Sequence, residues 1–329
     1  MKKILLSIVA LCCTVVAGAQ TTDQISAILQ VGNEAPQVFY GIGALQKAMA
    51  AAPDRGGVIT LSSGNFNSVT INKDVKIYGA GFETNEAEDI TLTNINSGFS
   101  ISIPEEITGP HDIILEGVYV NGNITVDKTL NGFSFIKSSV NTIKFTVATT
   151  STTVRQSYIR GNLEGGHNLY VQNSYLNCKW IGPFSDESNV LVDHCILVNG
   201  YDFDNGGTRF SCQNSIVAAG WNNGIQTYNY CLCPHWSNLN GFIGSYNNWF
   251  NIGDANVFED AENFNYSADR TFKLTEQNQT RYIGNDGTQV GVYGGSYPWN
   301  KEPSTPVVKN LKAKVAGTDL NVTYNAVVR

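Results

Sequence analysis

The segment Val171-Gln172-Asn173-Ser174-Tyr175-Leu176 decides the fold, because other segments of the chain repeat its pattern. Its order is apolar, polar, amide or imidazole, small, variable and apolar, and further copies begin at Val154, Val192 and Cys212. The small fourth residues are Ser157, Ser174, Cys195 and Ser215. They follow one another at steps of 17, 21 and 20 residues. A period of about twenty residues in a strand-rich sequence predicts a solenoid.

Stacking explains the pattern, since one strand alone buries little apolar surface. In coils about 4.8 Å apart, the first and last apolar positions face inward, and the fourth faces inward at a bend that requires a small residue. The third position, at Asn173, His194 and Asn214, is expected to form a polar ladder that satisfies backbone groups at the turn. In earlier coils we place Gly117 and Ser139 at the fourth position.

The second and fifth positions face outward and form two external columns. The first column consists of Arg155, Gln172, Asp193 and Gln213. The second column consists of Tyr158, Tyr175, Ile196 and Ile216. A ligand that lies along the outside of the solenoid would contact these two columns.

The amino-acid composition and net charge limit the classes of partner that the chain could bind. The chain has 329 residues, a formal net charge of -7 and only 15% charged residues, which fits one long all-β solenoid with many turns. Nucleic acids and anionic membranes bind patches of Lys and Arg, so the acidic balance argues against both. An anionic polysaccharide would need a local Arg or Lys, or a bridging cation, to overcome this charge.

Residues 1–19 have the order of a secretory signal peptide. Lys2 and Lys3 precede an apolar run over Ile4–Val16, and Ala17-Gly18-Ala19 forms the cleavage site. The run is too short to span a bilayer, and no other stretch is long and apolar enough to do so. We therefore expect a secreted protein (periplasmic, cell-surface or extracellular) without a transmembrane segment. The cysteines that follow the signal are expected to be small buried residues.

Flanking segments define the ends of the solenoid. Residues 44–52 form a predicted helix that Pro53 ends, and this helix would cover the open end of the first coil. Residues 307–329 alternate as a β-hairpin or as the start of an Ig-like module. The expected organisation is a signal peptide over 1–19, an N-terminal segment with a capping helix over 20–55, a β-helix over 56–296, a Pro-rich linker over 297–306 and the hairpin over 307–329.

The first coils resemble a known group of proteins. A helix, then Gly57-Val58-Ile59-Thr60-Leu61, a Gly64-Asn65-Phe66 turn and Val75-Lys76-Ile77-Tyr78-Gly79-Ala80-Gly81 are similar to the beginning of the pectin-lyase-like superfamily. The resemblance implies a single-stranded, right-handed parallel β-helix. At about twenty residues per coil, residues 56–296 would make about eleven coils.

The end of the chain resembles the closing segment of exported bacterial β-helix proteins. The similar segments are Phe258 to Phe264, Phe272-Lys273-Leu274 and Val290-Gly291-Val292-Tyr293-Gly294-Gly295. For a protein of this kind, the resemblance implies binding of polysaccharide or action on it. Because one β-helix fold hosts many roles, the resemblance alone does not fix the function.

The residues that mark known enzymes of this superfamily are mostly missing. The chain lacks the Asp-Asp, Gly-His-Gly and Arg-Ile-Lys segments of polygalacturonase-like hydrolases and the G-x-V-D-F-I-F-G segment of pectin methylesterases. Val190-Leu191-Val192-Asp193-His194-Cys195 is similar to the W-I-D-H segment of pectate lyases but lacks its Trp, and their R-x-P-x-x-R segment is absent. The resemblance therefore selects no particular activity.

Three aspartates are candidates for catalysis and metal binding. Asp202 and Asp204 lie two residues apart, so on an extended strand their side chains point the same way, about 6–7 Å apart. They could serve as an acid and base pair, because inverting hydrolases place carboxyl groups about 6.5–9.5 Å apart. With Asp193 they could instead hold Ca²⁺, which takes roughly six to eight oxygen ligands. A solvated Asp-Asn-Gly turn is the alternative without a function.

Arg155 is the third catalytic candidate, and two tyrosines are candidates for substrate binding. Arg155 shares the outward column of Asp193, two coils earlier, which corresponds to about 10 Å. In lyases that the chain resembles, an Arg acts as base near Ca²⁺, which its high pKa makes demanding. Tyr158 and Tyr175 are adjacent in the other column. They could bind a sugar face or form an aromatic ladder that stabilises the sheet.

Two hypotheses for the function follow. The first is an exported lyase or hydrolase of plant or microbial polysaccharide, with its groove along these residues. The second is a non-catalytic β-helix that binds a glycan or a protein, or serves as a structural surface protein. In both we expect a monomer whose partner is a polysaccharide or cell-surface glycan, with Ca²⁺ as the cofactor to consider.

Overall fold

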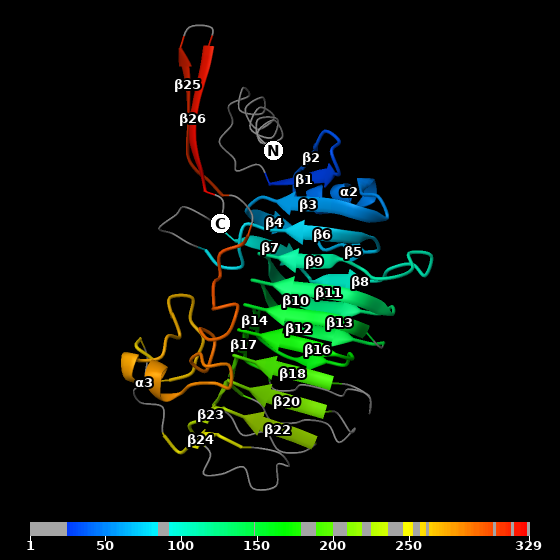
Figure 1. Ribbon diagram of the computed structural model, residues 1–329. Coiled ribbons are helices and arrows are strands. Elements are labelled where there is room, and N and C mark those ends of the chain that lie inside the picture. Colours follow the sequence, from blue (N-terminus) through cyan, green and yellow to red (C-terminus); the bar gives the residue numbers. More distant parts are fainter. Residues whose placement is uncertain are drawn as a thin grey trace.

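The structure is a computed structural model, and it describes residues 25–84, 92–147, 149–178, 189–199, 209–218, 225–235, 246–252, 257–260, 263–304, 307–316 and 319–327. In this part of the chain, short strands stack into a parallel β-solenoid of about 8 turns (Figure 1), which confirms the predicted fold class. No helix in the described ranges is long and apolar enough to cross a membrane.

A hairpin and a helix close the N-terminal end of the solenoid. β1 (Ser26–Val31) pairs antiparallel with β2 (Gln37–Tyr40) and with β3 (Arg55–Leu61), and α2 (Ala44–Ala51) contacts all three. The buried face of α2 consists of Ala44, Leu45, Ala48 and Met49. These residues lie on one side of a helix and contribute to the core of the solenoid. The predicted capping helix is confirmed, and it covers a sheet end that would otherwise pair with other chains.

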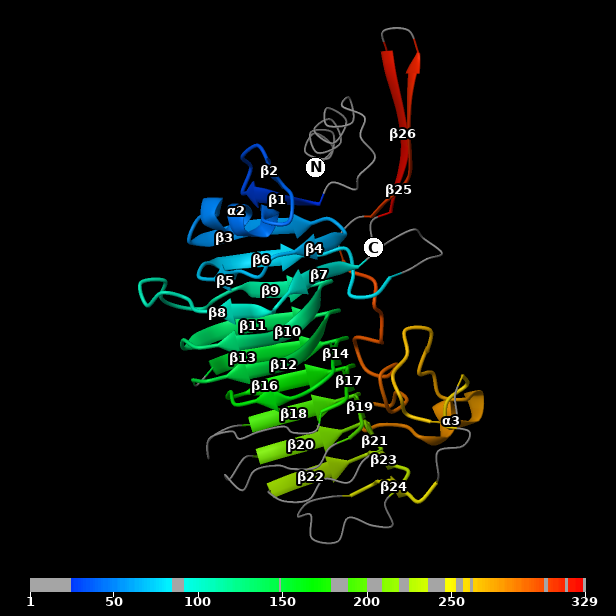
Figure 2. The ribbon, with the colours of Figure 1, turned by 180° about the vertical axis from the view of Figure 1, so that it is seen from behind.

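Two sheets run along the stack, and Figure 2 shows them from behind. The first, sheet A, continues in parallel from β3. Its further strands are β6 (Asp74–Tyr78), β9 (Ile113–Glu116), β11 (Leu130–Ile136), β13 (Thr149–Arg155), β16 (Leu169–Gln172), β18 (Asn189–Asp193), β20 (Arg209–Gln213) and β22 (Ile225–Asn229). Paired residues of neighbouring strands are about one repeat apart in the sequence, except in β6 and β9, where Ile77 pairs with Leu115, 38 residues later.

The second sheet, sheet B, is built in the same way. Its strands are β4 (Gly64–Phe66), β7 (Thr93–Asn96), β10 (Tyr119–Val126), β12 (Ser139–Phe145), β14 (Tyr158–Ile159), β17 (Tyr175–Leu176), β19 (Ile196–Leu197), β21 (Ile216–Val217), β23 (Leu232–Cys233) and β24 (Trp249–Phe250). Three short strands extend it, namely β5 (Thr70–Ile71), β8 (Phe99–Ile101) and β15 (Leu163–Glu164).

The interior of the solenoid is filled by the apolar positions of the repeat. Successive coils of sheet A place Leu115, Phe135, Val154, Val171 and Val192 inward, each 0% exposed. The cysteines behave as the sequence predicts, since those of the described residues are buried free thiols. They are Cys178, Cys195, Cys212, Cys231 and Cys233. Burial raises the pKa of the Cys195 thiol, so it stays protonated and acts as a small apolar residue.

From Gly117 onward, each described coil passes from sheet A to sheet B through one residue in the left-handed conformation. This residue is the third position of the repeat, and its φ lies between 45° and 71°. The residues are Gly117, Lys137, Gln156, Asn173, His194, Asn214, Tyr230 and Asn247. Asn and His enter this region more readily than most side chains, which explains why they recur at the third position.

Hydroxyl groups at the fourth position connect neighbouring coils. Ser174 Oγ donates to the carbonyl of Gln172 at 2.7 Å and accepts the backbone N–H of Ser157 at 3.1 Å. Ser157 and Ser215 make the same two bonds in their own coils. These serine hydroxyls, which we call the hydroxyl ladder, therefore form hydrogen bonds with backbone groups that the bend removes from both sheets.

The predicted register of the earlier coils is wrong by one residue. Gly117 occupies the third position, with a φ of 71°, and the fourth position belongs to Val118. The N–H of Val118 bonds to Ser138 Oγ at 3.1 Å, so Ser138, and not Ser139, continues the hydroxyl ladder. A glycine resembles a small fourth residue in the sequence. Its conformational freedom is needed at the left-handed third position instead.

The chain leaves the stack after β24 and returns along its outside (Figure 1). We call residues 257–304 the strap, and its one helix among the described residues is α3 (Glu276–Arg281). The β-helix expected up to residue 296 is therefore shorter, because the closing segment covers the solenoid and adds no coil. Beyond the strap, β25 (Val307–Ala316) and β26 (Asp319–Val327) form the predicted antiparallel hairpin.

We expect Ser174→Ala to lower the free energy of unfolding by about 1–3 kcal/mol, because the buried N–H of Ser157 loses its acceptor. Denaturant-induced unfolding measures the change. The control is Ser134→Ala on the outer face of β11, where the effect should stay within about 0.5 kcal/mol. Equal effects of the two substitutions would contradict a structural role for the ladder.

Candidate functional site

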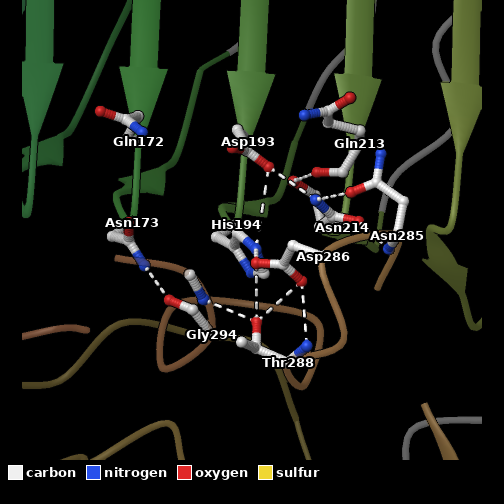
Figure 3. A network of polar contacts seen from close by, with 12 residues as sticks. Gln172, Asn173, Asp193, His194, Gln213, Asn214, Asn285, Asp286, Thr288 and Gly294 are labelled. Carbon is white, nitrogen blue, oxygen red and sulfur yellow. Dashed lines mark hydrogen bonds and ion pairs between the residues drawn. The ribbon is translucent and has the colours of Figure 1, made fainter. Parts of the chain in front are cut away.

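The strap crosses the turns of the solenoid in reverse order, one coil after another. Its hydrogen bonds, in chain order, join Asn285 to Asn214, Asp286 to His194, Gly294 to Asn173, Pro298 to Gln156 and Ser304 to Glu116. The first four of these partners are third-position side chains. Figure 3 shows this network at three successive coils.

These bonds correct the expected polar ladder. Asn173 Nδ2 donates to the carbonyl of Gly294 at 2.8 Å. The side chain of Asn214 both donates to and accepts from Asn285, at 2.9 Å each way. The prediction that Asn173, His194 and Asn214 satisfy backbone groups of their own turn is therefore wrong, because each of them bonds to the strap. A left-handed residue directs its side chain out of the coil, where the strap supplies the partners.

His194 and Asp286 pair an imidazole of the solenoid with a carboxylate of the strap. His194 is 2% exposed, and its Nε2 lies 3.0 Å from Asp286 Oδ2. Thr288 donates its hydroxyl and its N–H to Asp286 Oδ1. Partial burial works to raise the pKa of Asp286, but the Thr288 bonds and His194 outweigh it, so the pKa lies below its ordinary value of 3.8. A Cβ on Gly294 would lie 2.3 Å from His194 Nδ1, which explains this glycine of the closing segment.

The strap also buries the fifth-position column, which the sequence analysis placed on the outside. Tyr175, Ile196 and Ile216 are at most 1% exposed. They belong to a second hydrophobic cluster with apolar residues of the strap. Its strap members are Val257, Phe258, Phe264, Phe272, Leu274, Tyr282, Val290, Val292 and Trp299. The column does point away from the solenoid interior, but it forms a second core and no open surface.

The two tyrosines expected to bind a sugar belong to this second core. Tyr158 stacks on Tyr266 with ring centroids 3.7 Å apart, and Tyr175 meets the ring of Tyr158 edge-on at 5.4 Å. Tyr175 also donates its hydroxyl to the carbonyl of Phe264, and burial raises its pKa. In this structure the protein's own side chains therefore occupy the place of the sugar at both rings.

The second-position column lies beside the strap on the outer face of sheet A. Arg155, Gln172 and Asp193 stand directly opposite one another on β13, β16 and β18, as the repeat predicts. Adjacent strands are about 4.8 Å apart, so Arg155 and Asp193 are separated by about 10 Å. With Tyr170 and Tyr297, these residues form what we call the Arg155 patch.

Arg155 is held against an aromatic ring and not against a carboxylate. Its guanidinium carbon lies 4.1 Å from the ring centroid of Tyr297, a cation–π contact, and Tyr297 is 41% exposed. The Nε of Arg155 has no hydrogen-bond partner, and among the described residues the guanidinium makes no hydrogen bond or ion pair. Arg155 therefore places an unpaired positive charge at the surface.

Tyr170 connects the two other polar residues of the patch. Gln172 Nε2 donates to the Tyr170 hydroxyl at 2.6 Å, and Tyr170 donates to Asp193 Oδ2 at 3.2 Å. Asn214 Nδ2 donates to Asp193 Oδ1 at 2.9 Å. Burial and the Asp193 carboxylate raise the pKa of Tyr170, so its hydroxyl remains a donor. Both oxygens of Asp193 are thus engaged, and its exposed fraction is 9%.

The predicted metal and acid–base groups are described only in part. Among the described residues, no group of three or more His, Cys, Asp or Glu is placed to hold a metal ion. Asp202 and Asp204 lie outside the described residues. The hypotheses of a carboxylate pair and of Ca²⁺ at Asp193 therefore stay predictions. Ca²⁺ at Asp193 would bind carboxylate oxygens that also accept hydrogen bonds from Tyr170 and Asn214.

Sequence reasoning missed two residues of the patch. Tyr170 precedes Gln172 by two positions, so strand alternation places both on one face, and this signal was present in the sequence. Tyr297 falls in the segment interpreted as a Pro-rich linker. Its contact with Arg155 depends on the path of the strap, for which no local pattern gives a signal.

Comparison with protein-family models, with curated proteins and with solved structures finds no match for this chain. The parallel β-solenoid is therefore established by the structure itself. The finer assignment to the pectin-lyase-like superfamily rests on the quoted segments.

We expect Asp286→Asn to destabilise the protein at neutral pH, and we expect this effect to disappear in acid. Because the folded pKa of Asp286 lies below 3.8, its carboxylate contributes stability that is fully present above that pH. The contribution is lost as the pH falls through the folded pKa. Thermal unfolding of both proteins across this range measures the difference.

The control for this experiment is Asp269→Asn, which changes an exposed carboxylate of the strap. It should leave the melting temperature close to that of the unchanged protein at every pH. A deficit of Asp286→Asn that persists undiminished in acid would contradict the assigned role.

Proposed function

We propose that the protein binds a polysaccharide that carries carboxylate groups, at the Arg155 patch. The observation that carries this proposal is the unpaired guanidinium of Arg155, which Tyr297 holds on an exposed face. A chain with a net charge of -7 repels anionic polymers at a distance. A cation without an internal partner is the group that such a chain needs to bind one.

The patch offers the chemistry that an acidic sugar requires. A guanidinium donates two parallel hydrogen bonds to a carboxylate, and no other side chain matches that geometry as well. The exposed ring of Tyr297 offers an apolar surface to the C–H groups of a sugar ring. Gln172, one coil further along the column, has a side-chain carbonyl that can accept a hydrogen bond from a sugar hydroxyl. Successive sugars lying along the column would meet successive coils.

The described groups of the patch support binding more than cleavage. The Asp193 carboxylate accepts two hydrogen bonds and is nearly buried, which restricts it as a base. The guanidinium of Arg155 acts as a hydrogen-bond donor. The other hypothesis from the sequence is cleavage, in which a hydrolase would depend on Asp202 and Asp204 and a lyase on Ca²⁺ at Asp193 with Arg155 as the base. Product analysis on the same polysaccharides tests that hypothesis directly.

Two further parts of the proposal come from the sequence. Residues 1–19 support export of the protein, which would bring it into contact with extracellular or cell-surface glycans. The segments over 57–81 and 258–295 support membership of the pectin-lyase-like superfamily, in which such substrates are common.

We expect Arg155→Ala to weaken binding of an acidic polysaccharide about tenfold or more, because a charge-assisted hydrogen bond is lost. Arg155→Lys should restore only part of the affinity, since an ammonium neither pairs with a carboxylate through two parallel bonds nor stacks on Tyr297 in the same way. Affinity electrophoresis through gels that contain carboxylated or neutral polysaccharides measures both effects.

The matched control is Arg281→Ala, which removes the same charge from an exposed position on α3. Retention of full affinity by Arg155→Ala, or an equal loss in both variants, would overturn the proposal. Release of shortened or unsaturated fragments from the polysaccharides would show that the protein cleaves them, and the function would then be depolymerisation.

A further inference from the structure

A concave surface lies on sheet B, beside the capping helix. It is a hollow of about 710 Å³ between α2, β5, β8 and β10, and it contains no residue of the Arg155 patch. We propose that this hollow, here called the sheet B hollow, binds a neutral, hydroxyl-rich oligosaccharide. The inference rests on different residues from the proposed function and stands or falls independently of it.

The shape of the hollow is fixed by the backbone. Strand β10 changes register between Val120 and Asn123, so sheet B bends there. Gly98 and Gly122 cross at this bend with φ values of 89° and 155°. A Cβ on Gly98 would lie 2.0 Å from the carbonyl oxygen of Asn123. The two glycines therefore allow the close approach of neighbouring coils that produces the concavity.

The lining of the hollow is polar and uncharged. Its polar side chains are the amides of Gln46 and Asn123 and a set of hydroxyl groups. The hydroxyl groups belong to Ser68, Thr70, Ser97, Ser100 and Thr125. No Lys, Arg, Asp or Glu is among the residues that line it. An anionic ligand would find no cation among these lining residues.

The hydroxyl groups are arranged in register and are available to a ligand. Thr70, Ser100 and Thr125 stand opposite one another on β5, β8 and β10, at the spacing of about 4.8 Å between strands. The hydroxyls of Thr70 and Thr125, like those of Ser68 and Ser97, make no hydrogen bond to any described residue. Ser100 makes a long contact of 3.4 Å to Asp127.

A neutral oligosaccharide is the ligand that these features fit. Its many hydroxyls both donate and accept, as do the hydroxyls and amides of the hollow. The partly buried side chain of Val69 gives the lining an apolar element, which suits the C–H groups of a sugar. Asp127, exposed next to Ser100, disfavours acidic sugars. The two proposed sites thus differ in the charge of their ligands, which are neutral here and acidic at the Arg155 patch.

Titration calorimetry of the full chain with cellohexaose, xylohexaose and mannohexaose tests the proposal. We expect at least one of the three to bind. The variant that combines Thr70→Val and Thr125→Val keeps the side-chain volume but removes two hydroxyls, so it should weaken binding about tenfold. The control combines Thr60→Val with Thr153→Val on the outer face of sheet A, and it should bind as the unchanged protein does.

Arg155→Ala separates this site from the proposed function, because it should leave binding of the neutral oligosaccharide unchanged. Melting curves establish that each variant is folded before it is titrated. The proposal is overturned if none of the three oligosaccharides binds, if the double variant in the hollow binds as tightly as its control, or if Arg155→Ala abolishes binding.

Discussion

The left-handed residue at the third position, which recurs in the coils from Gly117 onward, is the constraint on which the rest of the structure depends. It turns the chain from sheet A to sheet B within one residue, so that the fourth position faces the core and a serine there accepts an N–H of the neighbouring coil. The same conformation directs the third side chain outward. A requirement of the backbone therefore produces a row of polar groups along one side of the solenoid, at the spacing of the stack.

The strap makes use of this row and of the apolar column next to it. Its polar contacts follow the third positions, and its aromatic residues cover the fifth positions, so the two halves of the interface have the same repeat. This arrangement places Tyr297 over Arg155 at the edge of the covered area. The Arg155 patch is thus composite, because the coils supply the charge and the strap supplies the ring that holds it.

Local patterns were sufficient to predict the solenoid, the capping helix, the hairpin and the column that contains Arg155 and Asp193. They depend on alternation and on a period, which the sequence displays directly.

The same patterns failed where a residue contacts a segment that lies far away in the sequence. Tyr175 and Ile196 were predicted to lie on an exposed face, because nothing near them in the sequence indicates that the strap covers them. His194 was predicted to belong to a polar ladder within the turns, because its actual partner, Asp286, lies far along the chain. Gly117 was misplaced by one residue because glycine suits both a position that needs a small residue and one that needs the left-handed conformation.

The central claim is that the coils and the strap together present Arg155 to an acidic polysaccharide. A crystal structure of the protein with a bound oligosaccharide of uronic acids tests it most directly. The account predicts a carboxylate on the guanidinium of Arg155, a sugar ring beside Tyr297 and the strap still in place along the third positions. A ligand seated elsewhere, or one that binds where the strap has been displaced from Tyr158 and Tyr175, would contradict it.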